Sequence, residues 1–229
     1  MKMRTEGKRV GSRRWGWWVA WAFMTFLCVL VSLISFPPYL PFVPDVHNIA
    51  MNPSFPHTHA LIIALHAVPA GLAMLLGPFQ FVAPLRRRFP TVHRNVGRVY
   101  LICIALGGTL GVLAATISVA GFVPASGFFV LGVLWLYSGV QAYVSIRKKR
   151  IQLHRVWMIR NFALTFGAVM LRLILPVGLT VTSIPRADLY SVAAWAWAIS
   201  LVFAEWFIVQ RTLRPPAQTQ RQHSATETT

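Results

Sequence analysis

Acidic side chains are scarce in this sequence, which has 22 lysines and arginines but only five aspartates and glutamates in 229 residues. It contains no paired carboxylates, no nucleophile beside a base and no glycine-rich phosphate loop. Hydrolysis and phosphoryl transfer need those groups, so neither chemistry has support. These absences favour a protein without catalytic activity.

Cysteine is almost as rare, with only Cys28 and Cys103, and both lie in apolar runs. Their spacing is not that of a metal knuckle or a redox pair, so we predict two buried thiols that behave as small apolar groups. The nearest candidate for a metal site is His57 with His59, which lacks an acidic ligand beyond Asp45. The sequence does not decide whether the protein binds a metal ion.

Charged residues as a whole are also few, at 12%, whereas 56% of the residues are hydrophobic. This composition excludes an ordinary soluble domain. Six stretches approach the length of about 20 apolar residues that a membrane-spanning helix needs. The sequence therefore predicts an all-α polytopic membrane protein with a six-helix bundle, whose helices are expected at residues 15–36, 60–83, 99–119, 127–146, 162–182 and 189–210.

The net charge of +17 does not indicate nucleic-acid binding, because the positive charge alternates from loop to loop. Segments 84–98 and 147–160 are rich in lysine and arginine, whereas 37–59 and 120–127 contain none. The positive-inside rule then places both termini in the cytoplasm. The bilayer is the expected partner, and the sequence leaves the oligomeric state open.

We divide the chain into a basic cytoplasmic N-terminus, residues 1–14, a transmembrane domain, 15–210, and a polar tail, 211–229, predicted to be disordered. The first apolar segment has the basic start of a signal peptide. Its core is too long and no small-residue cleavage motif follows, so we interpret it as an uncleaved anchor.

One helix carries an arginine, Arg172, far from its ends. Five helical turns separate it from His154, so both lie on one face with Asn161 and Thr165. Arginine within a bilayer costs about 2.5–3.5 kcal/mol and usually faces the protein interior. We therefore predict that Arg172 is buried in the bundle, and we hypothesise that it pairs with Glu205.

A second polar stripe runs along helix 60–83, where His66 and Gln80 share a face with small residues. We predict that both side chains are buried. With Ser138, Gln141 and Ser145 on helix 127–146, they suggest a polar interior that widens toward the cytoplasm.

The pattern His-Arg occurs twice at the cytoplasmic start of a span, in "HRNVGRVY" from His93 and "HRVWMIRN" from His154. Two histidines on facing helices can ligate a b-type haem. Gly97 would leave room for a porphyrin edge, Tyr100 lies on the same side, and the arginines Arg94 and Arg155 could meet the propionates. The alternative is that these groups contact lipid phosphates.

Three stretches carry a family resemblance: "LHAVPAGLAMLLGPFQF", "FPTVHRNVGRVY" and "LHRVWMIRNFALTFGAVMLRLILP". Together they resemble the bacterial multi-pass membrane proteins classed as domain of unknown function 2306 (DUF2306). The resemblance implies a bacterial inner-membrane protein and implies no activity. The matching motifs contain His66, Gln80, His93, Arg94, Gly97, Arg98, Tyr100, His154, Arg155, Arg160 and Arg172.

A weaker similarity is to six-helix b-type cytochromes, which hold two haems with histidines on four consecutive spans. This sequence departs from that plan, because segment 127–146 has no histidine.

Three functions stay open. The first is a structural or sensory protein with a His- and Arg-lined interior. The second is a redox protein that binds haem through His93 and His154, with a quinone near Arg172. The third is a small transporter or proton path through His66, Arg172 and Glu205.

Overall fold

The computed structural model describes the backbone of residues 4–35 and 57–213 and the side chains of 15–35 and 61–211. His47, the side chains of His57 and His59 and most of the tail 211–229 lie outside this description, so the metal considered at these histidines is not tested.

The described part of the chain is mainly helical and contains no strand, as the sequence predicts. Six helical regions are long and apolar enough to cross a membrane. The elements are α1 (Arg4–Ser35), α3 (His57–Leu76), the 3-10 helix η3 (Pro78–Phe81), α4 (Ala83–Arg88), α5 (Pro90–Thr116), α6 (Phe122–Arg147), α7 (Ile151–Val181), α8 (Arg186–Ala193), α9 (Trp197–Ile208) and the π-helix η4 (Val209–Leu213).

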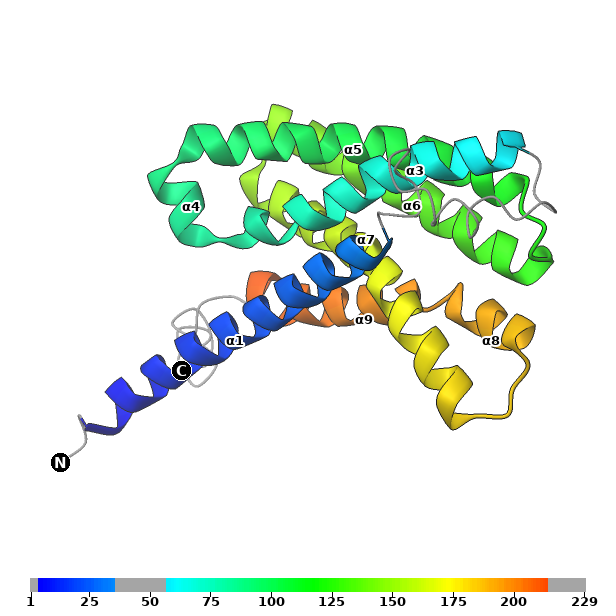
Figure 1. The fold of residues 1–229 in the computed structure, drawn as a ribbon. Coiled ribbons are helices and arrows are strands. Elements are labelled where there is room, and N and C mark those ends of the chain that lie inside the picture. Colours follow the sequence, from blue (N-terminus) through cyan, green and yellow to red (C-terminus); the bar gives the residue numbers. More distant parts are fainter. Residues whose placement is uncertain (1–3, 36–56, 214–229) are drawn as a thin grey trace, which may run out of the picture.

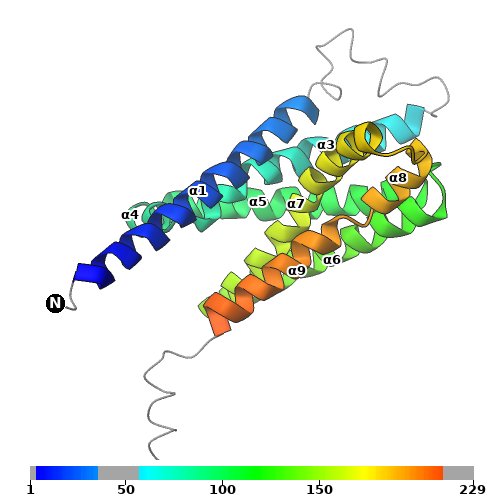
Figure 2. The same ribbon diagram turned by 90° about the horizontal axis from the view of Figure 1, so that it is seen from below.

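Three helices, α3, α5 and α6, lie side by side, and α7 crosses them to reach α8 and α9 on its other side (Figure 1). The main core comes from α3, α5, α6, α7 and α9 around Tyr100 and Trp135. A smaller core, which includes Cys28 and Phe162, attaches α1 to α3 and α7. The view from below shows α1 along one flank of the bundle (Figure 2). The burial of Cys28 and Cys103, at 0% and 5% exposure, agrees with the prediction for both thiols.

Two helices begin earlier than the apolar pattern predicts. Helix α5 starts at Pro90 and α7 at Ile151, so His93 and His154 lie in helical first turns. Proline is favoured at the start of a helix because its missing N–H has no intrahelical partner there. Apolarity alone could not predict that these first turns are helical, because they carry basic residues.

The sixth predicted span is interrupted between α8 and α9, where residues 194–196 form a turn. Trp197 at the start of α9 packs against Gly167 of α7, where a β-carbon would lie 2.5 Å from the Trp197 side chain. The Trp197 indole N–H also donates to the carbonyl of Gly127 at 3.2 Å. The break therefore lets a large side chain enter the bundle.

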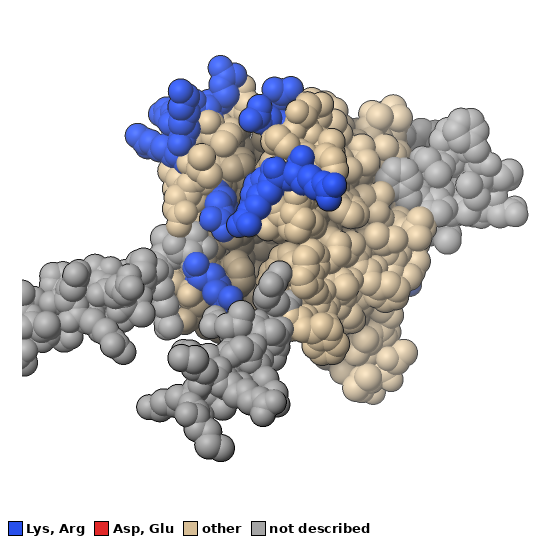
Figure 3. All heavy atoms as spheres, turned by 90° about the vertical axis from the view of Figure 1, so that its left-hand side faces the viewer, with Lys and Arg blue, Asp and Glu red and all other residues tan. Residues whose placement is uncertain are grey.

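The loops α4–α5 and α6–α7 lie at the same end of the bundle, which we call the basic end. Figure 3 shows lysine and arginine side chains gathered on this face. Three exposed tryptophans, Trp15, Trp17 and Trp18, begin the membrane-spanning part of α1. Tryptophan is enriched at membrane–water interfaces, so these residues indicate where α1 enters the bilayer.

Candidate functional site

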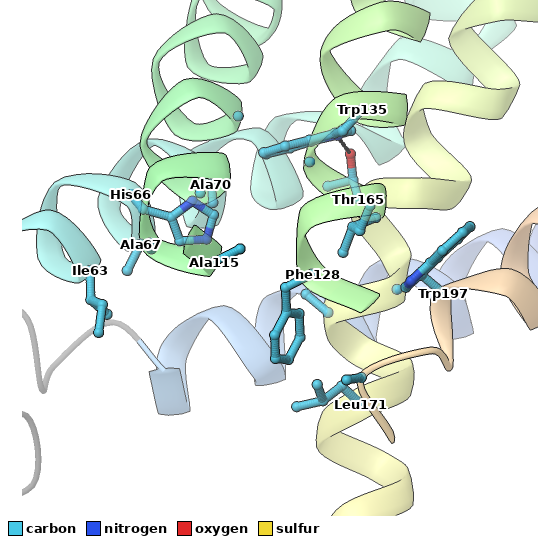
Figure 4. Close-up of a pocket in the computed structure, with 18 of the residues that line it drawn as sticks. Ile63, His66, Ala67, Ala70, Ala115, Phe128, Trp135, Thr165, Leu171 and Trp197 are labelled. Carbon is cyan, nitrogen blue, oxygen red and sulfur yellow. Dashed lines mark hydrogen bonds between the residues drawn. The ribbon is translucent and has the colours of Figure 1, made fainter. Parts of the chain in front are cut away.

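A cavity of about 370 Å³ lies in the half of the bundle away from the basic end. Helices α1, α3, α5, α6, α7, α8 and α9 all contribute to its lining, as does the α5–α6 loop at residues 117–120. Figure 4 shows His66, Phe128, Trp135 and Trp197 around it. Most of the lining is apolar or aromatic, which is typical of a site for a small molecule.

His66 occupies one side of the cavity and is held in one tautomer. Its Nδ1 lies 2.7 Å from the carbonyl oxygen of Gly107, which can only accept, so Nδ1 donates and Nε2 is an acceptor. The ring fits because α5 has glycine at 111, where a β-carbon would lie 2.7 Å from Nδ1. The Gly107 and Gly111 pair therefore sets both the α3–α5 approach and the place of the imidazole.

Arg172 also lines the cavity but is not buried. Its Nε donates to Ser35 Oγ at 2.6 Å and its Nη1 donates to the carbonyl of Ala168 at 3.2 Å. Because α7 starts at Ile151, Arg172 lies roughly 31 Å along the helix, close to the full thickness of a bilayer core. The prediction of a buried arginine is wrong: the side chain is exposed and lies toward the end of the span away from the basic end.

Glu205 does not pair with Arg172, contrary to our hypothesis. Its two carboxylate oxygens accept from Nε and Nη2 of Arg160, at 2.6 and 2.9 Å. Arg160 precedes Arg172 by roughly 18 Å along α7. The Glu205 side chain is 43% exposed, so it is not buried as predicted, and it does not line the cavity.

A network of buried polar groups lies between the cavity and the basic end. Tyr100 donates to Oδ1 of Asn161 at 2.7 Å and also contacts Oγ1 of Thr165, while the Trp135 indole N–H donates to Thr165 at 2.8 Å. The amide of Asn161 donates to Ser138 and to the carbonyl of Trp135. These bonds tie α5, α6 and α7 together, and Trp135 and Thr165 also line the cavity.

The polar stripes face inward only in part, because Arg172 is exposed and His66 and Gln141 are partly buried. Asn161 and Thr165 on α7, Ser138 and Ser145 on α6, and Gln80 after α3 are all buried. The sequence did not show how deep each polar group lies relative to the polar groups of the neighbouring helices. Side-chain azimuth shows that polar groups share a face, but the interhelical depths depend on where each helix begins.

The two histidines proposed as haem ligands both lie at the basic end, in the first turns of α5 and α7. Nδ1 of His154 donates to the carbonyl of Ala142 at 2.8 Å, which leaves Nε2 as a free acceptor. The space beside Gly97 is taken, however, because Gln80 Oε1 lies 3.2 Å from where a β-carbon would be. Tyr100 is 0% exposed and belongs to the network. In this conformation, therefore, the room expected for a porphyrin edge is filled by Gln80.

No group of three or more potential metal ligands occurs among the residues that the structure describes. The fold and the cavity together define a membrane-spanning helical bundle with a ligand-sized internal site.

The chain belongs to the family described as "Predicted membrane protein (DUF2306)", whose model matches residues 63–208. The match covers the elements that line most of the cavity, from α3 through α9. No curated protein matches the chain, and no solved structure matches it.

Proposed function

We propose that this protein binds a small lipophilic molecule with an oxygen-bearing head in the cavity, within the bacterial inner membrane and with both termini cytoplasmic. The observation that supports the proposal most directly is Ser32. This residue lines the cavity and is 2% exposed, and its hydroxyl has no hydrogen-bond partner among the residues that the structure describes. An unsatisfied buried hydroxyl costs about 1–3 kcal/mol, which a ligand would recover.

The polar groups of the cavity indicate the kind of head. Arg172 is a donor, Ser32 can donate or accept, and Nε2 of His66 is an acceptor. The walls are aromatic and aliphatic, with Trp135, Trp197 and Phe128 among them. A quinone has ring oxygens that accept from arginine and serine, its reduced form donates to imidazole, and its ring packs against aromatic walls. A quinone is therefore the chemical class to test.

The location and orientation rest on the charge pattern. Helix α1 begins and α9 ends at the basic end, where the α4–α5 and α6–α7 connections also lie (Figure 1). Under the positive-inside rule this end is cytoplasmic, so the cavity lies in the outer half of the membrane.

The experiment measures binding of a short-chain naphthoquinone to the purified protein in detergent by tryptophan fluorescence. Two cavity tryptophans, Trp135 and Trp197, would report contact with the ring. We expect Ser32→Ala to weaken binding about fivefold or more while the free energy of unfolding stays equal or rises, because the orphan hydroxyl is gone. The matched pair Arg172→Gln and Arg186→Gln removes one outer arginine each, and only Arg172 lines the cavity. Equal affinities for wild type, Ser32→Ala and Arg172→Gln would refute the proposal.

A b-type haem on His93 and His154 is a second candidate. The tautomer of His154 favours it, because a backbone carbonyl on Nδ1 is the usual partner of an imidazole that ligates metal through Nε2. The filled space beside Gly97 counts against it. A visible spectrum of protein from haem-replete cells decides: a Soret band lost in His154→Ala would support haem, and a colourless preparation would reject it.

A proton path or transporter through His66, Arg172 and Glu205 gains less support. Glu205 is bound to Arg160 and lies outside the cavity. The buried side chains of Tyr100, Asn161 and Thr165 lie between the cavity and the basic end, bonded to one another.

A further inference from the structure

Six basic side chains from three helices meet at the basic end: Arg86, Arg87, His93, Arg94, His154 and Arg155, here named the basic cluster. Burial lowers the pKa of Arg86, and the charges of Arg155 and Arg87 lower it further. His93 and Arg94 lie at the start of α5, which follows α4 after one residue and packs against it. Residues from α4, α5 and α7 are therefore near enough to repel one another.

This charge has no carboxylate to balance it in the described bundle. Between residues 61 and 211 the acidic residues are Asp188 and Glu205. Both oxygens of Glu205 are bonded to Arg160. Asp188 lies in the first turn of α8, which is at the opposite end of the molecule from α4 (Figure 1). Bringing like charges together is unfavourable unless an anion joins them.

Two buried atoms at the same place also have no hydrogen-bond partner among the residues whose side chains are described. They are Nε2 of Gln80, whose side chain is 6% exposed, and Nδ1 of His93. Gln80 packs against Gly97, and His93 is one helical turn before Gly97 on the same side of α5. The amide nitrogen of Gln80 is a donor, and Nδ1 of a histidine can be one. These unpaired donors lie beside closely spaced guanidinium groups. Together they could bind one group that has several hydrogen-bond acceptor atoms.

We propose that the basic cluster, with Gln80, binds the phosphate group of an anionic molecule. Phosphate offers several acceptor oxygens and one or more negative charges, and guanidinium groups bind it in a bidentate geometry. The site lies where α4 and the first turns of α5 and α7 meet the membrane surface. Both a phospholipid headgroup and a free phosphate compound can reach such a place.

The test is a thermal unfolding titration of the full chain in a neutral detergent. Three probes are compared: short-chain phosphatidylglycerol, inorganic phosphate, and a monoacylglycerol of the same chain length. We expect phosphatidylglycerol to raise the unfolding midpoint and the uncharged monoacylglycerol not to do so. A matching rise with inorganic phosphate would identify free phosphate as sufficient, and a rise with the lipid alone would assign the site to a headgroup. No rise with either phosphate compound would overturn the proposal.

Variants separate binding from folding. Arg155→Gln removes a repelling charge, so the ligand-free midpoint should be unchanged or higher, while the affinity for the responding probe falls about tenfold. Gln80→Met keeps the length of the side chain and removes the amide donor, and should weaken binding severalfold. Lys148→Gln makes the same change of charge at an exposed position of the α6–α7 turn and serves as the control. If Arg155→Gln and Lys148→Gln bound the probe equally, the basic cluster would not be the site.

Discussion

Arg160 and Glu205 form a two-pronged ion pair between α7 and the last span, with N–O distances of 2.6 and 2.9 Å. The guanidinium carbon of Arg160 also lies 4.7 Å from the ring centroid of Trp157, so the arginine is held by a carboxylate and by an aromatic face. This pair uses the single acid well within a predicted span. Arg172 instead donates to Ser35 and to the carbonyl of Ala168, and it lines the cavity.

The first prediction concerns the strength of that pair. In a double-mutant cycle with Arg160→Gln and Glu205→Gln we expect a coupling energy of about 1 kcal/mol, because the geometry is bidentate but both side chains are partly exposed. The measurement is the free energy of unfolding in detergent. Arg172→Gln with Glu205→Gln is the control cycle, and it should be additive. Coupling in the control but not in the Arg160 cycle would restore the pairing that the sequence suggested.

The second prediction concerns the buried network. Tyr100→Phe removes a hydroxyl that bonds Asn161 and contacts Thr165, and leaves Oδ1 of Asn161 without that donor. We expect a loss of about 1–3 kcal/mol in the free energy of unfolding. Tyr143→Phe is the matched control, because Tyr143 is exposed and its hydroxyl only accepts from Arg147 at 3.0 Å. That change should stay within about 0.5 kcal/mol. Equal effects of the two variants would argue against a stabilising network.

The sequence predicted the number and class of the helices because membrane spans are marked by length and apolarity, two properties that need no tertiary information. It also predicted the burial of Asn161 and Gln80, but not the exposure of Arg172 on the same face of α7 as Asn161. It could not predict partners across helices. The helix starts at Ile151 and not at 162, which places Arg172 toward the end of the span away from the basic end. The cavity was beyond reach for the same reason, since its lining comes from seven helices.

The third prediction tests the glycine that seats His66. A β-carbon at Gly111 would lie 2.7 Å from Nδ1 and 2.8 Å from Cε1 of His66. Gly111→Ala should therefore push the ring off the carbonyl of Gly107, destabilise the protein by about 1–3 kcal/mol and weaken any ligand of the cavity. Gly16→Ala is the control, because nothing lies within 4 Å of its β-carbon position. Its effect should be neutral or stabilising by up to about 1 kcal/mol. Identical stability and binding for the two variants would show that the imidazole of His66 does not depend on the space at Gly111.

The fourth prediction tests the orientation on which the outer position of the cavity depends. Single cysteines replace Lys148 in the α6–α7 turn and Ala120 in the α5–α6 loop, both exposed. Background labelling should be low, since Cys28 and Cys103 are 0% and 5% exposed. A membrane-impermeant maleimide added to intact spheroplasts should label position 120 and leave position 148 unlabelled until the membrane is opened, because basic loops stay cytoplasmic. The reverse labelling pattern would show that the protein has the opposite orientation in the membrane. The cavity would then face the cytoplasm and the basic cluster the outer leaflet, so both binding proposals would need ligands from the opposite side.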